Sequence, residues 1–405
     1  MKSISLFSIL LLSILNCVAQ GNWTTKSAIF SGNTTQSIAH LAIGSKAYMG
    51  MGTALCFEWY EYDPSSDAYM QKANFPDTAA SNPAVFSING YGFVLANDNH
   101  LWKYDPQNDS WINAGADFPG APRYASYYFT IGSKGYVAGG SADLDNSLLK
   151  DFWEYNSLTN QWTALPDMPV ANSCGEAFAL HGKGFLTGGV APTGVCSFSR
   201  AVYCYDPSLQ SWTAKSNTPD GRFTASSFVI GDHAYLSMGI TKDAANLDAP
   251  NYHAYEYDDV MDSWSQVADI PFSEIWDEGV GFSIDGKGYM GLGDCNGMIN
   301  CSPGSQHRLF EFTPASTGIS VVDHSALARV FPNPFVQSAI IQFTMTLKNA
   351  ELKFRSITGA EIFSIQNFSG EWLRLERNEM PAGIYFLSFT DENQNNGLIK
   401  ICITD

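Results

Sequence analysis

The sequence predicts an all-β protein whose larger part is a ring of six four-stranded repeats. One motif recurs in which Tyr is followed by Asp or Asn and, seven positions after the Tyr, by Trp, as in Tyr205–Trp212. Its other copies are Tyr104–Trp111, Tyr155–Trp162, Tyr257–Trp264 and, with Tyr in place of Trp, Tyr62–Tyr69. A second motif precedes each copy and ends in an aromatic residue, at Tyr48, Phe93, Tyr136, Phe185, Tyr235 and Tyr289. The mean interval between these aromatics is about 48 residues, and four strands at such a period are typical of a β-propeller blade.

Each motif carries the residues that its strands and turns need. In Tyr205–Trp212, Asp206 is expected to accept backbone N–H bonds in the turn, and Pro207 presets the φ angle. Tyr205 and Trp212 fall on the two flanking strands, and such large rings suit a buried sheet face between packed blades. The preceding motif, for example Ile131–Tyr136, places a Gly-containing turn between two strands. Two hairpins therefore make up each repeat.

The sixth repeat lacks its last strand in the C-terminal direction. Phe312 stands at the Tyr position, but Ile319 occupies the position where Trp is expected. At the other end of the chain, Trp23–Ser27 resembles Trp212–Ser216. We therefore expect the strand around Trp23 to complete the sixth blade. This closure removes two free sheet edges that would otherwise promote aggregation.

On these residues the chain resembles the kelch propeller family. Gly pairs stand at Gly139-Gly140 and Gly188-Gly189, and Arg123 and Arg222 each follow a Pro at the opening of a repeat. The resemblance covers residues 23–314 and implies a six-bladed kelch-type β-propeller. The chain departs from the family pattern where the Gly pair is replaced, at Met51-Gly52, Ala96-Asn97 and Met238-Gly239.

The end of the chain predicts a separate, small antiparallel β-sandwich. The Tyr-Asp-Trp motif does not return after Pro314, and alternating strand patterns occupy Ala339–Phe343, Glu351–Ser356, Glu361–Ile365 and Ile384–Phe389. We expect the propeller to span residues 20–317, a linker to span 318–328 and the sandwich to span 329–405.

This tail resembles the type A C-terminal sorting domain of the type IX secretion system of Gram-negative bacteria. The matching motif residues are Pro332, Asn333, Pro334, Gly359, Gly383, Tyr385 and Lys400. The resemblance implies that the secretion machinery is a partner. It also implies passage through the periplasm to the outside of the cell, with the protein either released or held at the outer-membrane surface.

The first residues predict a signal peptide spanning residues 1–19. Lys2 precedes an apolar run from Ile4 to Leu15, and small residues then lead to a cleavage site between Ala19 and Gln20. The alternative is a lipoprotein signal with Cys17 as the lipidated residue, which Asn16 disfavours because a small residue is expected there. No later stretch has ~18 consecutive apolar residues, so no membrane span is expected in the mature protein.

The cysteines predict one disulfide and no metal site. Of the eight cysteines, seven follow the signal peptide, and an odd number cannot pair completely. Cys295 and Cys301 share a Gly- and Asn-rich loop and are the expected pair, whereas Cys196 can pair with Cys204 or with Cys174. The chain lacks the Cys-x-x-Cys pairs of a zinc site, and residues 143–146 offer alternating oxygens without the rest of a calcium loop. We expect no cofactor.

The charge of the chain argues against two classes of partner. The formal net charge is −18. Nearly all of it lies before residue 329, because the tail carries 7 basic and 8 acidic residues. A surface of this sign repels nucleic acid and anionic membranes, so neither is expected as a partner. Acidity that serves only to keep the surface hydrated is the plainer interpretation.

Repeat geometry predicts where a ligand binds. In a propeller the first strand of each blade lines a central channel, and the loops that enter these strands form one mouth. The position 13 residues before each closing aromatic marks equivalent sites, which include Arg123, Asn172, Arg222 and Trp276. The predicted ligand-binding residues are these four together with Tyr124, Glu176, Phe223, Asp277 and Glu278. Arg pairs with carboxylates, and aromatics and acids contact sugars, which favours an acidic ligand. The alternative is that the arginines bridge blades or pair with internal carboxylates.

Three classes of function remain open. We favour a binding module for a glycan or a protein. The second is a carbohydrate-acting enzyme, for which the sialic-acid epimerase-like kelch type needs no metal and suits Arg and Glu at the mouth. A copper oxidase of the kelch type is not expected, since the histidines do not fall on the mouth positions. The third is a structural adhesion protein. Because the serine-hydrolase, zinc-protease and phosphate-loop motifs do not occur in the sequence, catalysis is less expected than binding.

Overall fold

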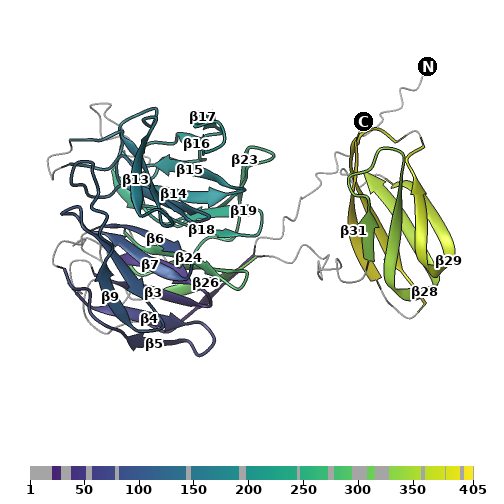
Figure 1. Cartoon of the computed structure of the whole chain (residues 1–405), viewed down its shortest axis with the longest axis horizontal. Coiled ribbons are helices and arrows are strands. Elements are labelled where there is room, and N and C mark those ends of the chain that lie inside the picture. The colour runs from purple at the N-terminus through teal and green to yellow at the C-terminus, as the bar shows by residue number, and fades with distance from the viewer. Residues whose placement is uncertain are drawn as a thin grey trace, which may run out of the picture. The chain divides into compact units, whose positions relative to one another are not determined.

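The computed structural model describes thirteen segments of the chain. They are residues 21–28, 38–51, 57–77, 82–142, 147–190, 198–243, 247–271, 278–293, 308–314, 328–356, 361–378, 380–392 and 396–404. The chain divides into two compact units, residues 1–315 and 316–405, which are described separately. Figure 1 colours the strands of the first unit from purple to green and those of the second yellow-green to yellow.

The first unit is the predicted propeller. Its described residues form six four-stranded antiparallel sheets, each of which is one blade. Blade 1 contains β2 (Ala39–Ile43), β3 (Lys46–Gly50), β4 (Trp59–Asp63) and β5 (Ala68–Gln71). Blade 2 contains β6 (Ala84–Ile88), β7 (Tyr91–Leu95), β8 (Leu101–Asp105) and β9 (Ser110–Asn113). Blade 3 contains β10 (Tyr127–Ile131), β11 (Lys134–Ala138), β12 (Phe152–Asn156) and β13 (Gln161–Leu165).

The second half of the ring repeats this arrangement. Blade 4 contains β14 (Gly175–Leu180), β15 (Lys183–Gly188), β16 (Val202–Asp206) and β17 (Ser211–Lys215). Blade 5 contains β18 (Ser226–Ile230), β19 (His233–Ser237), β22 (Tyr255–Asp258) and β23 (Ser263–Gln266), with a hairpin of β20 (Ile240–Lys242) and β21 (Asp248–Pro250) inserted. Blade 6 contains β24 (Val280–Ile284), β25 (Lys287–Gly291), β26 (Leu309–Thr313) and, as its fourth strand, β1 (Asn22–Thr25).

The N-terminal strand closes the ring, which confirms the prediction made from Trp23. β1 pairs with β26 so that Trp23 lies opposite Phe312. Tyr205 and Trp212 lie opposite each other in the same way in blade 4. The Trp23 indole donates a hydrogen bond to the Ala268 carbonyl of blade 5 at 2.7 Å. The equivalent indoles of blades 2 to 5 each donate to a carbonyl that follows the preceding blade, from Trp111 to Ala73, Trp162 to Ala116, Trp212 to Pro166 and Trp264 to Ser216.

The repeated turns form for the predicted reason. The carboxylate of Asp206 accepts the backbone N–H of Ser208 at 2.9 Å, and Asp105 accepts that of Gln107 at the same distance. The aromatic rings pack between blades as expected. Phe152 of blade 3 lies 4.7 Å from Tyr205 and 4.9 Å from Trp212 of blade 4, and such ring pairs add about 0.5–1.5 kcal/mol each to the area that they bury.

A glycine before the closing aromatic lets neighbouring blades approach. A Cβ on Gly184 would lie 2.1 Å from the ring of Phe129 in blade 3, and one on Gly288 would lie 2.1 Å from the ring of Phe228 in blade 5. Any side chain at these positions would therefore displace a buried ring. In each of these motifs the first glycine, Gly182 or Gly286, has the positive φ of the turn, whereas the second, Gly184 or Gly288, serves packing.

The second unit is a β-structure with its own core. β28 (Ser338–Ser356) pairs with β27 (Ala328–Phe331) along its first half, with β30 (Gly383–Thr390) along its second half, and with β29 (Glu361–Glu376) over most of its length. β31 (Asn396–Ile403) pairs with β30. Phe343 from the first half of β28 meets Phe389 of β30 at 5.2 Å, so the sheet folds over a shared core. This is the small sandwich predicted for the tail.

Some predictions fall on residues outside those described. They concern the signal residues Ala19 and Gln20, the cysteines Cys295 and Cys301, the tail residue Gly359, and the mouth residues Trp276 and Asp277. Cys204 is described, and it is a buried thiol on β16 without a disulfide. Within the described ranges, no helix is long and apolar enough to cross a membrane.

Candidate functional site

The six inner strands surround one central channel. Residues of β2, β6, β10, β14, β18 and β24 together line a cavity of about 290 Å³. A smaller pocket of about 70 Å³ lies where the chain enters these strands, and it receives residues from all six blades. The two cavities share His40, Tyr128 and Glu176 in their walls, so they adjoin each other. We call the smaller one the central pocket.

The rim of the central pocket is held in an unusual backbone conformation. One rim residue from each of blades 2 to 6, eleven positions before the closing aromatic, has a positive φ although it is not Gly. These residues are Asn82 (46°), Ala125 (48°), Cys174 (55°), Thr224 (52°) and Glu278 (52°). The left-handed region is uncommon for non-Gly residues and costs of order 1–3 kcal/mol where it is strained.

Hydrogen bonds from blade to blade account for this conformation. The N–H of Ala125 donates to the carbonyl of Asn82, that of Cys174 to Ala125, and that of Thr224 to Cys174, at 3.3, 2.9 and 2.8 Å. The left-handed turn directs each N–H toward the preceding blade. These bonds connect neighbouring blades around the rim and fix the positions of the side chains that face the pocket.

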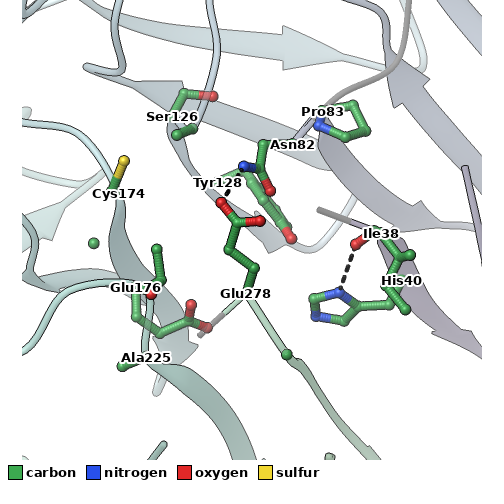
Figure 2. Close-up of a pocket in the computed structure, with 14 residues that line it drawn as sticks. Ile38, His40, Asn82, Pro83, Ser126, Tyr128, Cys174, Glu176, Ala225 and Glu278 are labelled. Carbon is green, nitrogen blue, oxygen red and sulfur yellow. Dashed lines mark hydrogen bonds between the residues drawn. The ribbon is translucent and has the colours of Figure 1, made fainter. Parts of the chain in front are cut away.

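Polar side chains converge in the central pocket (Figure 2). The Glu278 carboxylate accepts a hydrogen bond from the Asn82 amide at 3.0 Å, which links blades 6 and 2 across the rim. Glu176 and His40 lie on the two sides of Glu278 in the view, and Tyr128 lies behind. None of the described residues that line the pocket is Lys or Arg. The described lining therefore contains two carboxyl groups and several other hydrogen-bonding groups.

Glu176 is the most perturbed acid of the pocket. Burial in the channel wall raises its pKa to about 8, although the hydroxyl and backbone N–H of Ser227 donate to it and oppose the shift. The Ser227 hydroxyl lies 2.7 Å from the carboxyl oxygen. Burial, together with the nearby Glu176, also raises the pKa of Tyr128. At neutral pH these groups are mainly a carboxylic acid and a phenol, and both can donate hydrogen bonds.

His40 is held neutral. Burial lowers its pKa to about 4, although hydrogen bonds to the backbone of Ile38 and Gly281 oppose the shift. Its Nδ1 lies 3.4 Å from the Ile38 carbonyl. His40 lines the pocket although it does not stand at a mouth position counted 13 residues before a closing aromatic. Its neighbours in the pocket do not form a set of metal ligands within the described residues.

The two arginines predicted to face the mouth point elsewhere. Arg123 is buried, and its guanidinium donates to both Asp151 oxygens at 2.9 and 2.7 Å and lies over the Phe118 ring. Arg222 is also buried, with Asp220 at 2.5 and 3.1 Å. Each arginine has an acidic partner, and neither is among the described residues that line the central pocket. The contacts are therefore those of the alternative, in which the arginines pair with internal carboxylates.

Three other predicted residues also have internal roles. Asn172 is buried and its amide donates to the Gly188 carbonyl. Tyr124 exchanges backbone hydrogen bonds with Ser141, and Phe223 does so with Ile240. Of the described residues predicted for ligand binding, Glu176 and Glu278 line the central pocket. Four further residues that line the pocket, His40, Asn82, Ser126 and Tyr128, were not predicted from the sequence. Counting eleven rather than thirteen positions back from each closing aromatic would have found Asn82 and the rest of the rim.

A second group of ligand-type side chains lies on blade 2. One ligand atom from each of Asp77, Asp98 and His100 lies within 4.8 Å of the others. His100 Nδ1 is 3.1 Å from the Asp98 carboxylate, and the Trp102 indole donates to Asp77 at 3.0 Å. The carboxylates are thus engaged by neighbouring side chains, and nothing else at this group points to a ligand.

Known protein families match a part of each of the two units. A family model described as the kelch motif matches residues 130–169, and one described as a secretion system C-terminal sorting domain matches residues 329–404. Kelch-like protein 25 of Xenopus tropicalis is 25% identical over 238 residues, which are 55% of this chain and 38% of that protein. Kelch-like protein 23 of Homo sapiens is 27% identical over 197 residues, which are 48% of this chain and 33% of that protein. The chain thus spans about a third of the length of these relatives.

A solved structure resembles the propeller. The structure titled "Structure of YjhT" aligns with a TM-score of 0.56 and 16% identity, and covers 71% of this chain and 94% of its own. At this identity the likeness supports the fold alone.

Proposed function

Because the chain is a kelch-repeat propeller protein with a C-terminal secretion-system sorting domain, we propose that it is an exported binding module. Its ligand, a glycan or a protein, contacts the central pocket. The sorting domain implies export to the cell surface or the medium, and we propose the type IX machinery as the partner that performs it. Whether the mature protein is released or retained on the outer membrane follows from how that machinery processes the tail.

One observation carries the binding role: all six blades contribute to a single polar pocket at the centre of the ring. Binding sites are typically concave, with a few fixed polar groups among apolar walls. The Asn82–Glu278 bond and the rim hydrogen bonds fix the polar groups here before any ligand arrives. Preorganisation of this kind lowers the entropy cost of binding.

The test is a glycan array and a surface-protein pull-down with the mature full chain. We expect one of them to return a specific ligand, and we expect Asn82→Ala combined with Glu278→Gln to abolish that signal. The matched control is Asp232→Asn. Asp232 is an exposed acid in the β18–β19 turn, at the end of the blade away from the pocket. Binding that survives in the double variant but not in the control variant would reject the pocket as the site.

A second function is favoured by the Glu176 side chain. A carboxyl whose pKa lies near neutrality, beside a neutral imidazole and a phenol in one cavity, is suited to acid–base catalysis on a bound carbohydrate. Incubating the mature chain with each sugar that it binds and following the sugar by NMR tests this. A product that forms with wild type and not with Glu176→Gln would support catalysis, whereas an unchanged sugar would leave binding as the function.

A further inference from the structure

His181 occupies a turn position at which the other blades have shorter residues. It follows β14 directly and has a φ of 49°, in the left-handed region. Its equivalents are Gly44, Asn89, Gly132, Gly231 and Asp285, all with a positive φ. The turn itself therefore does not require an imidazole, and the contacts of its ring distinguish His181 from these residues.

Both ring nitrogens of His181 face carboxylates of blade 5. Nδ1 lies 2.8 Å from Asp259, in the β22–β23 turn, and Nε2 lies 3.0 Å from Asp232, in the β18–β19 turn. An ionised carboxylate only accepts hydrogen bonds, and a neutral imidazole has one N–H to donate, whereas an imidazolium has two. Both contacts are therefore hydrogen bonds at the same time only when the ring carries its second proton.

We propose that His181, as an imidazolium, is a pH-sensitive link that ties one turn of blade 4 to two turns of blade 5. When the ring loses a proton, the link loses one of its two hydrogen bonds and its charge attraction to both carboxylates. This inference is independent of the proposed binding function, because the three turns lie at the ends of the inner strands away from the central pocket.

Other titratable groups lie on the same strands and turns. On blade 4 they are Lys183, which pairs with Asp206 at 2.9 Å, and the buried thiol of Cys204; on blade 5 they are Asp258, which accepts the backbone N–H of Val260, and His233, whose Nδ1 lies 3.7 Å from Glu256. Among the described residues, His181 is the cationic group that bonds to Asp232 and Asp259. The Asp259 side chain is 11% exposed, so water screens its contact less than that of a fully exposed pair.

The direction of the pH dependence follows from these contacts. The hydrogen bonds to Asp232 and then Asp259 hold the pKa of His181 above its ordinary value of 6.5, although slight burial opposes them. Because the folded pKa is raised, the contribution of the link to stability is complete below a pH of about 6.5 and is lost as the pH rises through the raised pKa. The link therefore weakens toward alkaline pH.

The same junction between blades 2 and 3 is uncharged. Asn89 stands where His181 does, and its amide donates at 3.5 Å to the hydroxyl of Ser157, which stands where Asp259 does. An amide and a hydroxyl do not titrate near neutral pH. One junction of the ring is thus linked by a titrating pair and another by a neutral pair, so the chain contains its own control.

Histidine ring signals of the mature full chain, followed by NMR across pH, test the imidazolium. We expect one histidine to titrate above 6.5 and to be absent from the spectrum of His181→Asn. Its pKa should fall toward 6.5 in Asp232→Asn and in Asp259→Asn, because each variant removes one carboxylate from the ring. Asp285→Asn removes the same charge from the equivalent turn of blade 6 and should leave this pKa unchanged. A His181 pKa at or below 6.5, or one that either aspartate variant of blade 5 leaves unchanged, would overturn the proposal.

Amide hydrogen exchange, corrected for intrinsic rates, tests whether the contact links the blades. From about pH 6 to about pH 9, protection of the His181 and Asp259 turns should fall relative to the turns of Asn89 and Ser157. His181→Asn combined with Asp259→Ser copies the neutral pair and should remove this difference. Glu176, at the other end of β14, also titrates toward a pH of about 8, and the double variant separates the two effects because it keeps Glu176. Protection that changes equally at both junctions of the wild-type chain would contradict a link.

Discussion

Replacing Arg222 should destabilise the propeller without affecting ligand binding. Arg222 is 1% exposed, and its guanidinium forms two hydrogen bonds to Asp220, one to the Met238 carbonyl at 3.2 Å, and a cation–π contact with Tyr255. Burial on its own raises the pKa of Asp220, but the hydrogen bonds and charge of Arg222 outweigh it and hold that pKa below its usual value. Arg222→Ala removes this compensation and leaves the half-buried Asp220 carboxylate without its cation, although the Tyr255 hydroxyl still donates to it at 3.2 Å and Asn251 also bonds to it.

The expected loss in the free energy of unfolding follows from the burial of the Arg222–Asp220 ion pair. Removing one partner of a buried ion pair costs about 3–5 kcal/mol, and the side chain of Asp220 retains 22% exposure, which places the effect near 3 kcal/mol. For a propeller of about 300 residues, whose unfolding entropy is about 0.6 kcal/mol/K, that lowers the melting temperature by about 5 °C. The loss should be smaller at acid pH, because protonation of Asp220 removes the unpaired charge.

The assay is thermal and urea unfolding of the mature chain, followed by array binding below the melting temperature. Arg222→Lys serves as the matched control, since it keeps the charge but not the two parallel hydrogen bonds, and it should lie between wild type and Arg222→Ala. An unchanged melting temperature together with a lost ligand would refute the reasoning and return Arg222 to the ligand site.

Three further predictions test the rest of the account. Trp23→Ala should lower the melting temperature of the whole propeller, because it removes a packed ring and the bond to Ala268 at the closing strand, at a cost of about 3–5 kcal/mol; melting that is unchanged would mean that another segment closes blade 6. Because burial raises the folded pKa of Glu176 to about 8, the contribution of this carboxyl to stability is complete below a pH of about 4.5 and is lost as the pH rises toward about 8. Glu176→Gln should remove about 1–3 kcal/mol of that pH-dependent loss in urea titrations, a value reduced because the side chain is partly exposed, and stability profiles that run parallel with pH for both proteins would contradict this. Deleting residues 329–405 should leave a folded propeller in the periplasm, and fractionation that finds the truncated chain outside the cell at full yield would contradict a role of the tail in export.

The fold was predictable because its determinants are local and repeated. Asp206 closes its own turn with the N–H of Ser208, two residues away, so the motif reveals its structure without knowledge of the rest of the chain. The closing strand could also be predicted, because the residues that follow Trp23 resemble those that follow Trp212. The packing role of Gly184, by contrast, depends on a ring from the preceding blade and cannot be read from its own motif.

The site was only partly predictable for a related reason. The sequence indicates that Arg123 and Arg222 are equivalent, but not that their side chains turn toward Asp151 and Asp220. The pair Asp220 and Arg222 was available as a local signal, whereas Arg123 finds its partner 28 residues along the chain. The rim conformation was hidden because no Gly marks it: Ala125 and Thr224 are held left-handed by bonds between blades rather than by their own preference.

The crystal structure of the mature chain with the tightest ligand from the array or pull-down tests the central claim most directly. The account predicts ligand density in the central pocket, in contact with Glu278 and Asn82 and with a polar group directed toward Glu176. Density confined to the outer strands, or to the turns at the far end of the blades such as that of Asp206, would contradict it.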